Sequence, residues 1–557
     1  MKNSNCNNNG HNSNNINYLF FFIWRSSFLS RKIKSYQLAD LKQITCTIAY
    51  LNENIRYINN TTKDLKIRFI VNNQDDIKEY GDCQHKELIT SILWNQSLSN
   101  KRLSSFSNHS GADNSSGGSC CLTNSVTHLK ISKRVSQLDP HLIPDSVESL
   151  KFYQLKAPLR SDNHSLPVNL KTLKCFSLKS KIESLPDTLE SISIKSRYNF
   201  EFPNTFVWPS KLNKLHINAK FYSKFPVGVK ESYVIAFIKP TTLPGGYCLS
   251  DPSGARLESH QLANLTKLKV IHSTYWSPGL LPNTLQHAHL VCFWELVPGV
   301  LPHSITKLKL IHNHAIPAGF LPPNLKTLID FGETEVPYPN AIPTGVTTLS
   351  MHYFRPILRD TIPSSVTCLD ISNCNTPDDL VVPPSVAEYS FGRRQHTIAI
   401  PHTVRQVFID NRVQHWYKTD TFALPAHCTH LTLAKDKGVH GIAFNDSLRH
   451  VCVKKMKCKM LFPDHIQHMT ISILFHDLAT HLLPANLRSL KIKQAISSNV
   501  KIKSLPLHLK FLHLPSRRNL QCTVPKSVLL SIAQSYDTID DGSEEFVNID
   551  TNLLDQV

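Results

Sequence analysis

The 557-residue sequence lacks the marks of an exported or membrane-spanning chain. None of its apolar runs approaches the ~18–20 residues that are needed to cross a bilayer. The apolar stretch Leu19–Trp24 is too short for the central region of a secretory signal peptide. The 14 cysteines follow no framework spacing, and thiols in a chain without an export route are expected to stay reduced. These absences predict an intracellular, cytoplasmic protein with no membrane span.

The sequence also lacks the short motifs that mark common catalytic sites. We find no Walker-type phosphate loop, no set of protein-kinase motifs, no HExxH and no nucleophile elbow. It contains no CxxC pair either, which is the usual sign of a closed zinc site. We therefore expect a non-enzymatic protein that needs no cofactor and no metal.

What the sequence does contain is a repeat of about 20 residues. In its clearest part, prolines stand at positions 302, 322, 343, 363 and 383. Each unit has an apolar residue, the proline, two small or polar residues, an aliphatic residue, two variable residues, and then apolar-x-apolar. A fixed period in this range predicts a solenoid, in which stacked units bury a face that one unit cannot bury alone.

The positions within the repeat predict which side chains point inward. Apolar residues recur three, six and eight positions after the proline, as in Val366, Leu369 and Ile371. The last two belong to a period-two pattern, which is typical of a short strand with one buried face. The same register extends from Val126 to Val528. We expect about 20 coils of ~20 residues, with short parallel strands and little helix.

Several units resemble a known repeat. The segments LPHSITKLKL (301–310), LPPNLKTL (321–328) and IPSSVTCLDI (362–371) resemble the FNIP repeat, a relative of the leucine-rich repeat that is abundant in social amoebae. The Phe-Asn pair of that family survives at Phe444-Asn445, in a unit that has lost its proline. Secreted bacterial effectors with a ubiquitin-ligase domain have a similar proline-led unit. Too few residues follow the last unit here for such a domain, so we favour the FNIP family.

We divide the chain into six segments by composition and repeat pattern. They are an Asn-rich leader expected to be disordered (1–17), a helical cap or F-box-like segment (18–42), a cap subdomain or degenerate repeats (43–98), a Ser/Asn/Gly-rich linker (99–121), the repeat solenoid (122–536) and an acidic tail (537–557).

The segment 18–42 has two readings. Its bulky apolar residues fall roughly on one helical face, so it can form a cap, which terminal repeats of a solenoid require. It also resembles the F-box-like opening of many FNIP-repeat proteins. That resemblance implies docking to an adaptor subunit of a cullin-type ubiquitin ligase, with the solenoid as the substrate receptor.

The charge of the chain is unevenly distributed. The whole sequence has a net charge of +19, while residues 537–557 contain seven Asp or Glu and no Lys or Arg, which leaves +26 on the preceding residues. Such a body attracts acidic protein surfaces and, without specificity, nucleic acid or anionic membrane. A solubilising surface charge with no dedicated partner is the alternative.

Positions five and seven after the proline are expected to point outward and to form columns along the ladder. The basic residues at these positions are Lys130, Lys151, Lys174, Lys267, Lys269, His287, His289, Lys307, Lys309, His430, His450 and His468. Neighbouring strands lie ~4.8 Å apart, so an acidic ligand would relieve the repulsion within a column. Well-solvated side chains are the alternative, and a transition metal on the histidines is a further one. We predict a protein-binding scaffold whose partner presents an acidic surface.

Overall fold

The fold is known from a computed structural model. The structure describes residues 43–58, 66–95, 122–135, 143–156, 158–160, 166–194, 206–217, 226, 228–234, 259–270, 276, 278–292, 295–332, 339–353, 356–358, 360–374, 380–392, 400–410, 422–434, 442–457, 461–497, 499–525 and 528–532. The predictions for the leader, the segment 18–42, the linker and the acidic tail lie outside these residues. The chain divides into two units, residues 1–273 and 274–557, and each is described by itself.

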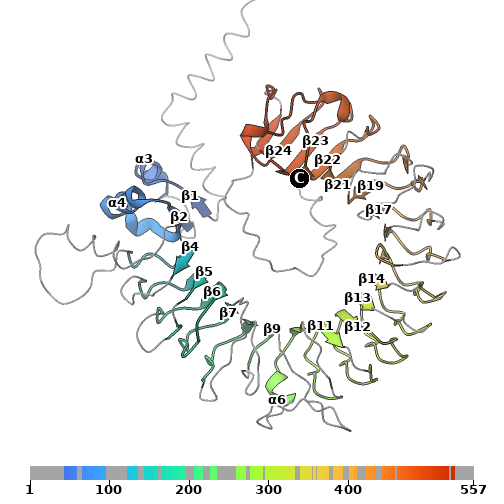
Figure 1. The fold of residues 1–557 in the computed structure, drawn as a ribbon, viewed down its shortest axis with the longest axis horizontal. Coiled ribbons are helices and arrows are strands. Elements are labelled where there is room, and N and C mark those ends of the chain that lie inside the picture. Colours follow the sequence, from blue (N-terminus) through green and yellow to red (C-terminus); the bar gives the residue numbers. More distant parts are fainter. Residues whose placement is uncertain are drawn as a thin grey trace, which may run out of the picture. The chain divides into compact units, whose positions relative to one another are not determined.

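The first unit is a ladder of parallel strands. Its strands are β1 (Gln43–Thr45), β2 (Lys66–Val71), β3 (Ile89–Trp94), β4 (His128–Val135), β5 (Ser149–Leu155), β6 (Thr172–Leu178), β7 (Ser191–Ile194), β8 (Lys214–Ile217), β9 (Glu231–Val234) and β10 (Lys267–Val270). Each strand pairs in parallel with the next one in the sequence. In Figure 1, β4 to β7 follow one another side by side.

Three short helices of this unit lie between its described strands, two of them in the first coils. Helix α3 (Ile48–Ile58) connects β1 to β2, and α4 (Gln74–Asp82) with the 3-10 turn η1 (Lys86–Leu88) connects β2 to β3. Asn73 caps the N-terminus of α4 and forms a capping box with Asp76. The short helix α6 (Ser259–Leu262) precedes β10. Residues 43–95 thus contribute strands to the same ladder as the repeats.

The second unit repeats this architecture. Its ladder consists of β11 (His287–Cys292), β12 (Lys307–His312), β13 (Thr327–Gly332), β14 (Thr348–Tyr353), β15 (Cys368–Asp370), β16 (Glu388–Phe391), β17 (Gln406–Ile409), β19 (His430–Leu433), β21 (His450–Met456), β22 (His468–Leu474), β23 (Ser489–Ala495), β24 (Phe511–Leu514) and β25 (Leu529–Ile532). All consecutive pairs are parallel.

The remaining elements of the second unit are short. Strands β18 (Phe422–Ala423) and β20 (Ile442–Ala443) pair with each other outside the ladder, and η3 (Thr480–Leu482) and η4 (Arg517–Asn519) are 3-10 turns. From β4 onward, the described ladder strands number seven in the first unit and thirteen in the second. The prediction of a parallel, leucine-rich-repeat-like solenoid with little helix is confirmed.

The buried core of each unit lies where the repeat register predicts it. The aliphatic residues at the repeat position that lies three after the proline are all buried from Val126 to Val528, including those of coils in which another residue replaces the proline. In the coil of Pro363, the side chains of Val366, Leu369 and Ile371 are 0% exposed. Such a coil contributes three apolar side chains to a continuous interior.

The proline and the polar residues that follow it form the turn that precedes each strand. The amide of Ile305 donates to the carbonyl of Pro302 at 3.2 Å, and that of Val366 donates to Pro363 at 3.1 Å. Proline suits this position because its fixed backbone angle favours a turn, and because its missing N–H is not needed there.

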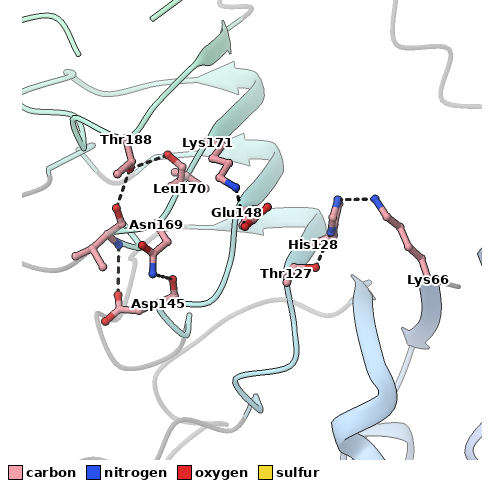
Figure 2. A network of polar contacts seen from close by, with 10 residues as sticks. Lys66, Thr127, His128, Asp145, Glu148, Asn169, Leu170, Lys171 and Thr188 are labelled. Atoms are coloured by element: carbon pink, nitrogen blue, oxygen red, sulfur yellow. Dashed lines mark hydrogen bonds and ion pairs between the residues drawn. The ribbon is translucent and has the colours of Figure 1, made fainter. Parts of the chain in front are cut away.

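In several coils a hydroxyl two positions after the proline joins the turn to the preceding coil. Ser365 Oγ donates to the carbonyl of Val346 at 2.6 Å, and Ser385 Oγ donates to that of Val366 at 2.7 Å. Figure 2 shows the same arrangement in the first unit, where Thr188 bonds to the carbonyls of the coil before it, among them that of Leu170 at 3.0 Å. The small polar residues of the repeat thus satisfy backbone groups between neighbouring coils.

Candidate functional site

Three of the expected outward lysines form a column on the first ladder. Lys130 is the Cα partner of Lys151, and Lys151 is the partner of Lys174, on β4, β5 and β6. Lys151 is exposed, and the other two are half-buried. We call these three residues the lysine column. Its flanking Cα partners are Leu93 and Ser193, so this row contains no acidic residue over five strands.

An exposed aromatic pair lies beside the lysine column. Tyr153 and Phe176 are two positions further along β5 and β6, and therefore on the same face as the lysines. Their rings stack with centroids 5.6 Å apart and an interplanar angle of 5°, yet the residues remain 44% and 43% exposed. This pair is not among the site residues predicted from the sequence, although aromatic residues at equivalent outward positions of two consecutive repeats are a signal for it.

A second column of the first unit is neutralised within the chain. Glu231 lies between Lys214 and Lys267, with Lys214 Nζ at 3.3 Å and Lys267 Nζ at 2.9 Å from its two carboxylate oxygens. The hydrogen bond from Lys267, more than any other contact, lowers the pKa of Glu231. Lys267 therefore already has an acidic partner. Lys269, on the same strand, is half-buried.

The other residues predicted with Lys267 and Lys269 belong to the second unit. There His287 pairs with Lys307, and His289 with Lys309, across β11 and β12. His289 differs from the expectation of an exposed side chain, since it is only 6% exposed. Strand alternation sets the direction of a side chain but not how far its neighbours cover it. Burial also lowers the pKa of Lys307.

The surface next to Lys309 continues as a row of rings. Lys309 Nζ lies 4.9 Å from the centroid of the Phe331 ring, which is within the range of a cation–π contact. Phe331 in turn stacks on His352, with centroids 4.0 Å apart and an angle of 5° between the planes. The ammonium group of Lys309 thus lies against an aromatic surface.

The three remaining histidines form a stacked column on the second ladder. His430, His450 and His468 are Cα partners on β19, β21 and β22. Their rings are nearly parallel, with centroids 4.1 Å and 4.4 Å apart. All three are half-buried. We call them the histidine column.

Burial and like charges disfavour protonation of His450 and His468. Burial, followed by the charges of His430 and His468, lowers the pKa of His450 to about 4. Burial and the nearby Arg488 lower the pKa of His468. Parallel rings direct their nitrogens alongside one another rather than toward one point. Among the described residues, no group of three or more His, Cys, Asp or Glu side chains could hold a metal ion.

The structure also reveals a polar network in the interior of the second unit. Asp330 pairs with Leu310 and Met351 on the neighbouring strands, so it occupies a core position that is apolar in the adjacent coils. His312 Nε2 lies 2.7 Å from Asp330 Oδ1, and the Tyr353 hydroxyl donates to Asp330 Oδ2. His312 and Asp330 are 0% exposed and Tyr353 is 2% exposed.

The hydrogen-bond acceptors of this network indicate which of its atoms carry protons. His312 Nδ1 contacts the carbonyl of His314, which can only accept, so Nδ1 carries a proton. The His312–Asp330 contact then holds one shared proton and no net charge, whichever atom carries it. Burial, and secondarily the charge of Asp330, raise the pKa of the Tyr353 phenol above its usual value, which keeps it a donor. We assign this buried network a structural role.

Comparison with known proteins supports the repeat assignment. The FNIP repeat family model matches residues 114–154 and 294–333. The chain contains FNIP repeats. The first matched segment includes Lys130 and Lys151 of the lysine column, and the second FNIP segment includes Lys307 and Lys309.

Other comparisons add little to the FNIP match. The solved structure of YopM from Yersinia enterocolitica WA-314 is similar over 74% of this chain and 88% of that chain, with 16% sequence identity and a TM-score of 0.29. A likeness this weak indicates nothing about activity or partners. No curated protein sequence matches the chain significantly. Among the described residues, no helix is long and apolar enough to cross a membrane.

Proposed function

We propose that the protein is a non-enzymatic scaffold that binds an acidic segment of a partner protein on the strand face of its FNIP-repeat solenoid. The observation that carries this proposal is the lysine column, which aligns three cations on consecutive strands beside the exposed Tyr153–Phe176 pair. A repeat solenoid offers such an extended, shallow surface rather than a closed pocket, which suits the binding of a chain more than catalysis.

The positive charge of the lysine column favours a partner with negative charge. Two ammonium groups ~5 Å apart repel by about 0.8 kcal/mol in water, so the lysine column stores repulsion that carboxylates of a partner would relieve. The column of Lys214, Glu231 and Lys267 shows the alternative, in which the chain itself supplies the carboxylate. Of these two columns of the first unit, the one without an acidic residue is therefore the better candidate for recognition.

The aromatic pair would add affinity that salt does not screen. Exposed aromatic side chains are common anchors of protein interfaces, because they bury a large area with little loss of conformational freedom. Tyr153 and Phe176 hold each other in a fixed stack, so an apolar side chain of the partner would meet a preformed surface. We therefore expect the bound segment to combine Asp or Glu with apolar residues.

The test is capture of partners from a cell lysate by three forms of the full chain, with quantitative mass spectrometry. The first form is the native sequence, and the second carries Lys130→Glu, Lys151→Glu and Lys174→Glu. The third is a matched control with the same charge change at exposed lysines outside the strands, Lys78→Glu, Lys181→Glu and Lys211→Glu.

The proposal expects at least a tenfold loss of captured partner with the lysine-column variant and little loss with the control. Capture by the native chain should also weaken as salt rises from ~0.1 M to ~0.5 M, because salt screens exposed charges. Replacing Tyr153 and Phe176 by Ala should weaken capture at both salt concentrations. Equal losses with the variant and the control would show that only net charge matters.

The alternative function is that of a substrate receptor of a cullin-type ubiquitin ligase, docked through residues 18–42. Those residues lie outside the described part of the chain, so this alternative rests on the sequence resemblance alone. Capture of an adaptor subunit by the full chain, and its loss on deletion of residues 18–42, would favour it over the simple scaffold.

A further inference from the structure

The end of the second ladder has an unbalanced charge. The ladder strands from β17 to β25 contain no Asp or Glu. They do contain the histidine column, His513 and four exposed lysines, which are Lys454, Lys455, Lys491 and Lys493. We call the outward side of these strands the histidine face.

Arginines border the histidine column on the adjacent row. Arg405, Arg449 and Arg488 directly precede the first residues of β17, β21 and β23. The polar residues on the remaining sides of the column are uncharged: Thr429, Gln406, Gln467 and Ser489. Every charged group that borders the three imidazoles on these strands is thus a cation.

The effect of these cations is visible on the histidines themselves. The charge of Arg488 contributes to the lowered pKa of His468, and those of Lys491 and Lys493 contribute to the lowered pKa of His513, although burial is the larger cause in both. A carboxylate placed on this face would oppose these effects and favour the imidazolium form.

The chain itself contains a segment of the complementary charge close by. The acidic tail follows β25, the last strand of the same ladder, and has seven carboxylates and no Lys or Arg between residues 537 and 557. Strand β22 is three strand spacings from β25, which is about 14 Å, and β19 is five spacings away, or about 24 Å. An extended chain from Ile532 reaches ~17 Å at Asp537 and ~30 Å at Asp541.

We propose that the acidic tail, residues 537–557, docks on the histidine face, and that the histidine column takes up protons when the tail docks. Its first carboxylates, Asp537, Asp540 and Asp541, have the reach to lie over His468, His450 and His430. The two segments belong to the same unit, and their charges are opposite. This inference is independent of the proposed function, which concerns the lysine column of the first unit.

The proposed contact depends on pH in a defined direction. Near neutral pH the lowered pKa values of His450 and His468 keep these two imidazoles uncharged, and the tail is attracted mainly by the arginines and lysines. As the pH falls toward 5, docking is coupled to protonation of the column, and the docked form gains up to tenfold in stability per pH unit for each proton taken up. The tail would then shield the histidine face from other acidic ligands at low pH.

The first test measures competition for the face. A fluorescein-labelled peptide of residues 533–557 is titrated, with anisotropy as the readout, against two forms of the full chain. One is native, and in the other every Asp and Glu of the tail is replaced by Asn or Gln. At pH 6 the peptide should bind the form with the uncharged tail at least fivefold more tightly, because the native tail occupies the face. Equal affinity for the two forms would overturn the proposal.

The second test asks whether the histidine column is the site. In the form with the uncharged tail, His430→Gln, His450→Gln and His468→Gln together should weaken peptide binding at pH 6 at least fivefold and abolish its pH dependence. The matched control changes three exposed histidines in the proline turns, His402→Gln, His427→Gln and His508→Gln, and should bind as before. Binding that depends on pH equally in both variants would refute the assignment to the column.

A further variant protects the test against misfolding. Lys491 and Lys493 are exposed, so replacing both by Gln should leave the melting temperature unchanged while weakening peptide binding at pH 6 at least threefold. Unchanged binding in this variant would also refute the proposal. An acidic partner that binds the native chain and the form with the uncharged tail equally well would show that the face belongs to another protein.

Discussion

The buried network of the second unit gives the sharpest prediction of stability. Tyr353→Phe removes the hydroxyl that donates to Asp330 Oδ2 and leaves a buried carboxylate oxygen without that donor. Loss of one partner of a buried hydrogen bond to a charged group costs about 2 kcal/mol. Asp330→Leu fits the apolar column of Leu310 and Met351 but strands two buried polar groups, which costs about 4 kcal/mol.

The two substitutions should not be additive. In the double variant the Tyr353 hydroxyl is no longer present to be stranded, so its cost should fall at least 1.5 kcal/mol below the sum of the single costs. The assay is urea unfolding followed by circular dichroism, with hydrogen exchange of the amides of β12 to β14 as the local measure.

Tyr389→Phe provides the matched control for this cycle. Tyr389 is 1% exposed on β16 of the same ladder, and its hydroxyl has no hydrogen-bond partner among the described residues. Removing that hydroxyl should leave stability unchanged or raise it slightly. A cost for Tyr389→Phe equal to that of Tyr353→Phe, or strict additivity in the double variant, would refute the assignment of a coupled network.

Three further predictions address the repeat and the histidine column. Leu369→Asp buries a carboxylate at a fully buried position and should cost several kcal/mol in unfolding, whereas Lys309→Asp should change the melting temperature little; similar melting of both would contradict the register. Ser365→Ala removes the bond to the Val346 carbonyl and should cost about 1 kcal/mol in urea unfolding. His450 has a lowered pKa, so the unfolded state protonates first as the pH falls. The form with the uncharged tail, in which no docked carboxylate opposes this shift, should lose about 2 kcal/mol between pH 6.5 and pH 4 after allowance for solvent screening. His450→Gln should remove this part of the pH dependence, and an unchanged pH profile of stability would contradict it.

The sequence was sufficient to predict the interior of the solenoid. The inward positions of Val366, Leu369 and Ile371 follow from a repeat that recurs many times along the sequence. Coils of this kind stack most simply when their apolar residues at equivalent positions are buried. The alignment of the lysine column followed from the same register. The pairing of His430, His450 and His468 did as well, since equal repeat positions on neighbouring strands must lie side by side.

The contacts between side chains could not be obtained from the period. Asp330 interrupts the apolar pattern, but nothing in the sequence identifies His312 and Tyr353 as its partners, because they lie 18 and 23 residues away in different coils. His289 has an outward position and is nevertheless buried. Glu231, which neutralises Lys267, lies in a neighbouring coil whose proline-led register is weak. Each of these features depends on the coil beside it, which a one-dimensional pattern does not specify.

The hydroxyl that joins a turn to the preceding coil has a consequence for how the chain can gain or lose repeats. For Ser365 and Ser385 the acceptor is the carbonyl at the same repeat position one period earlier, that of Val346 and of Val366. Deletion of residues 363–382 would bring Ser385 opposite Val346, in the place that Ser365 held. Duplication or loss of a whole period can therefore leave the bonds between neighbouring coils in place. Each such event adds one residue to every outward column or removes one from it.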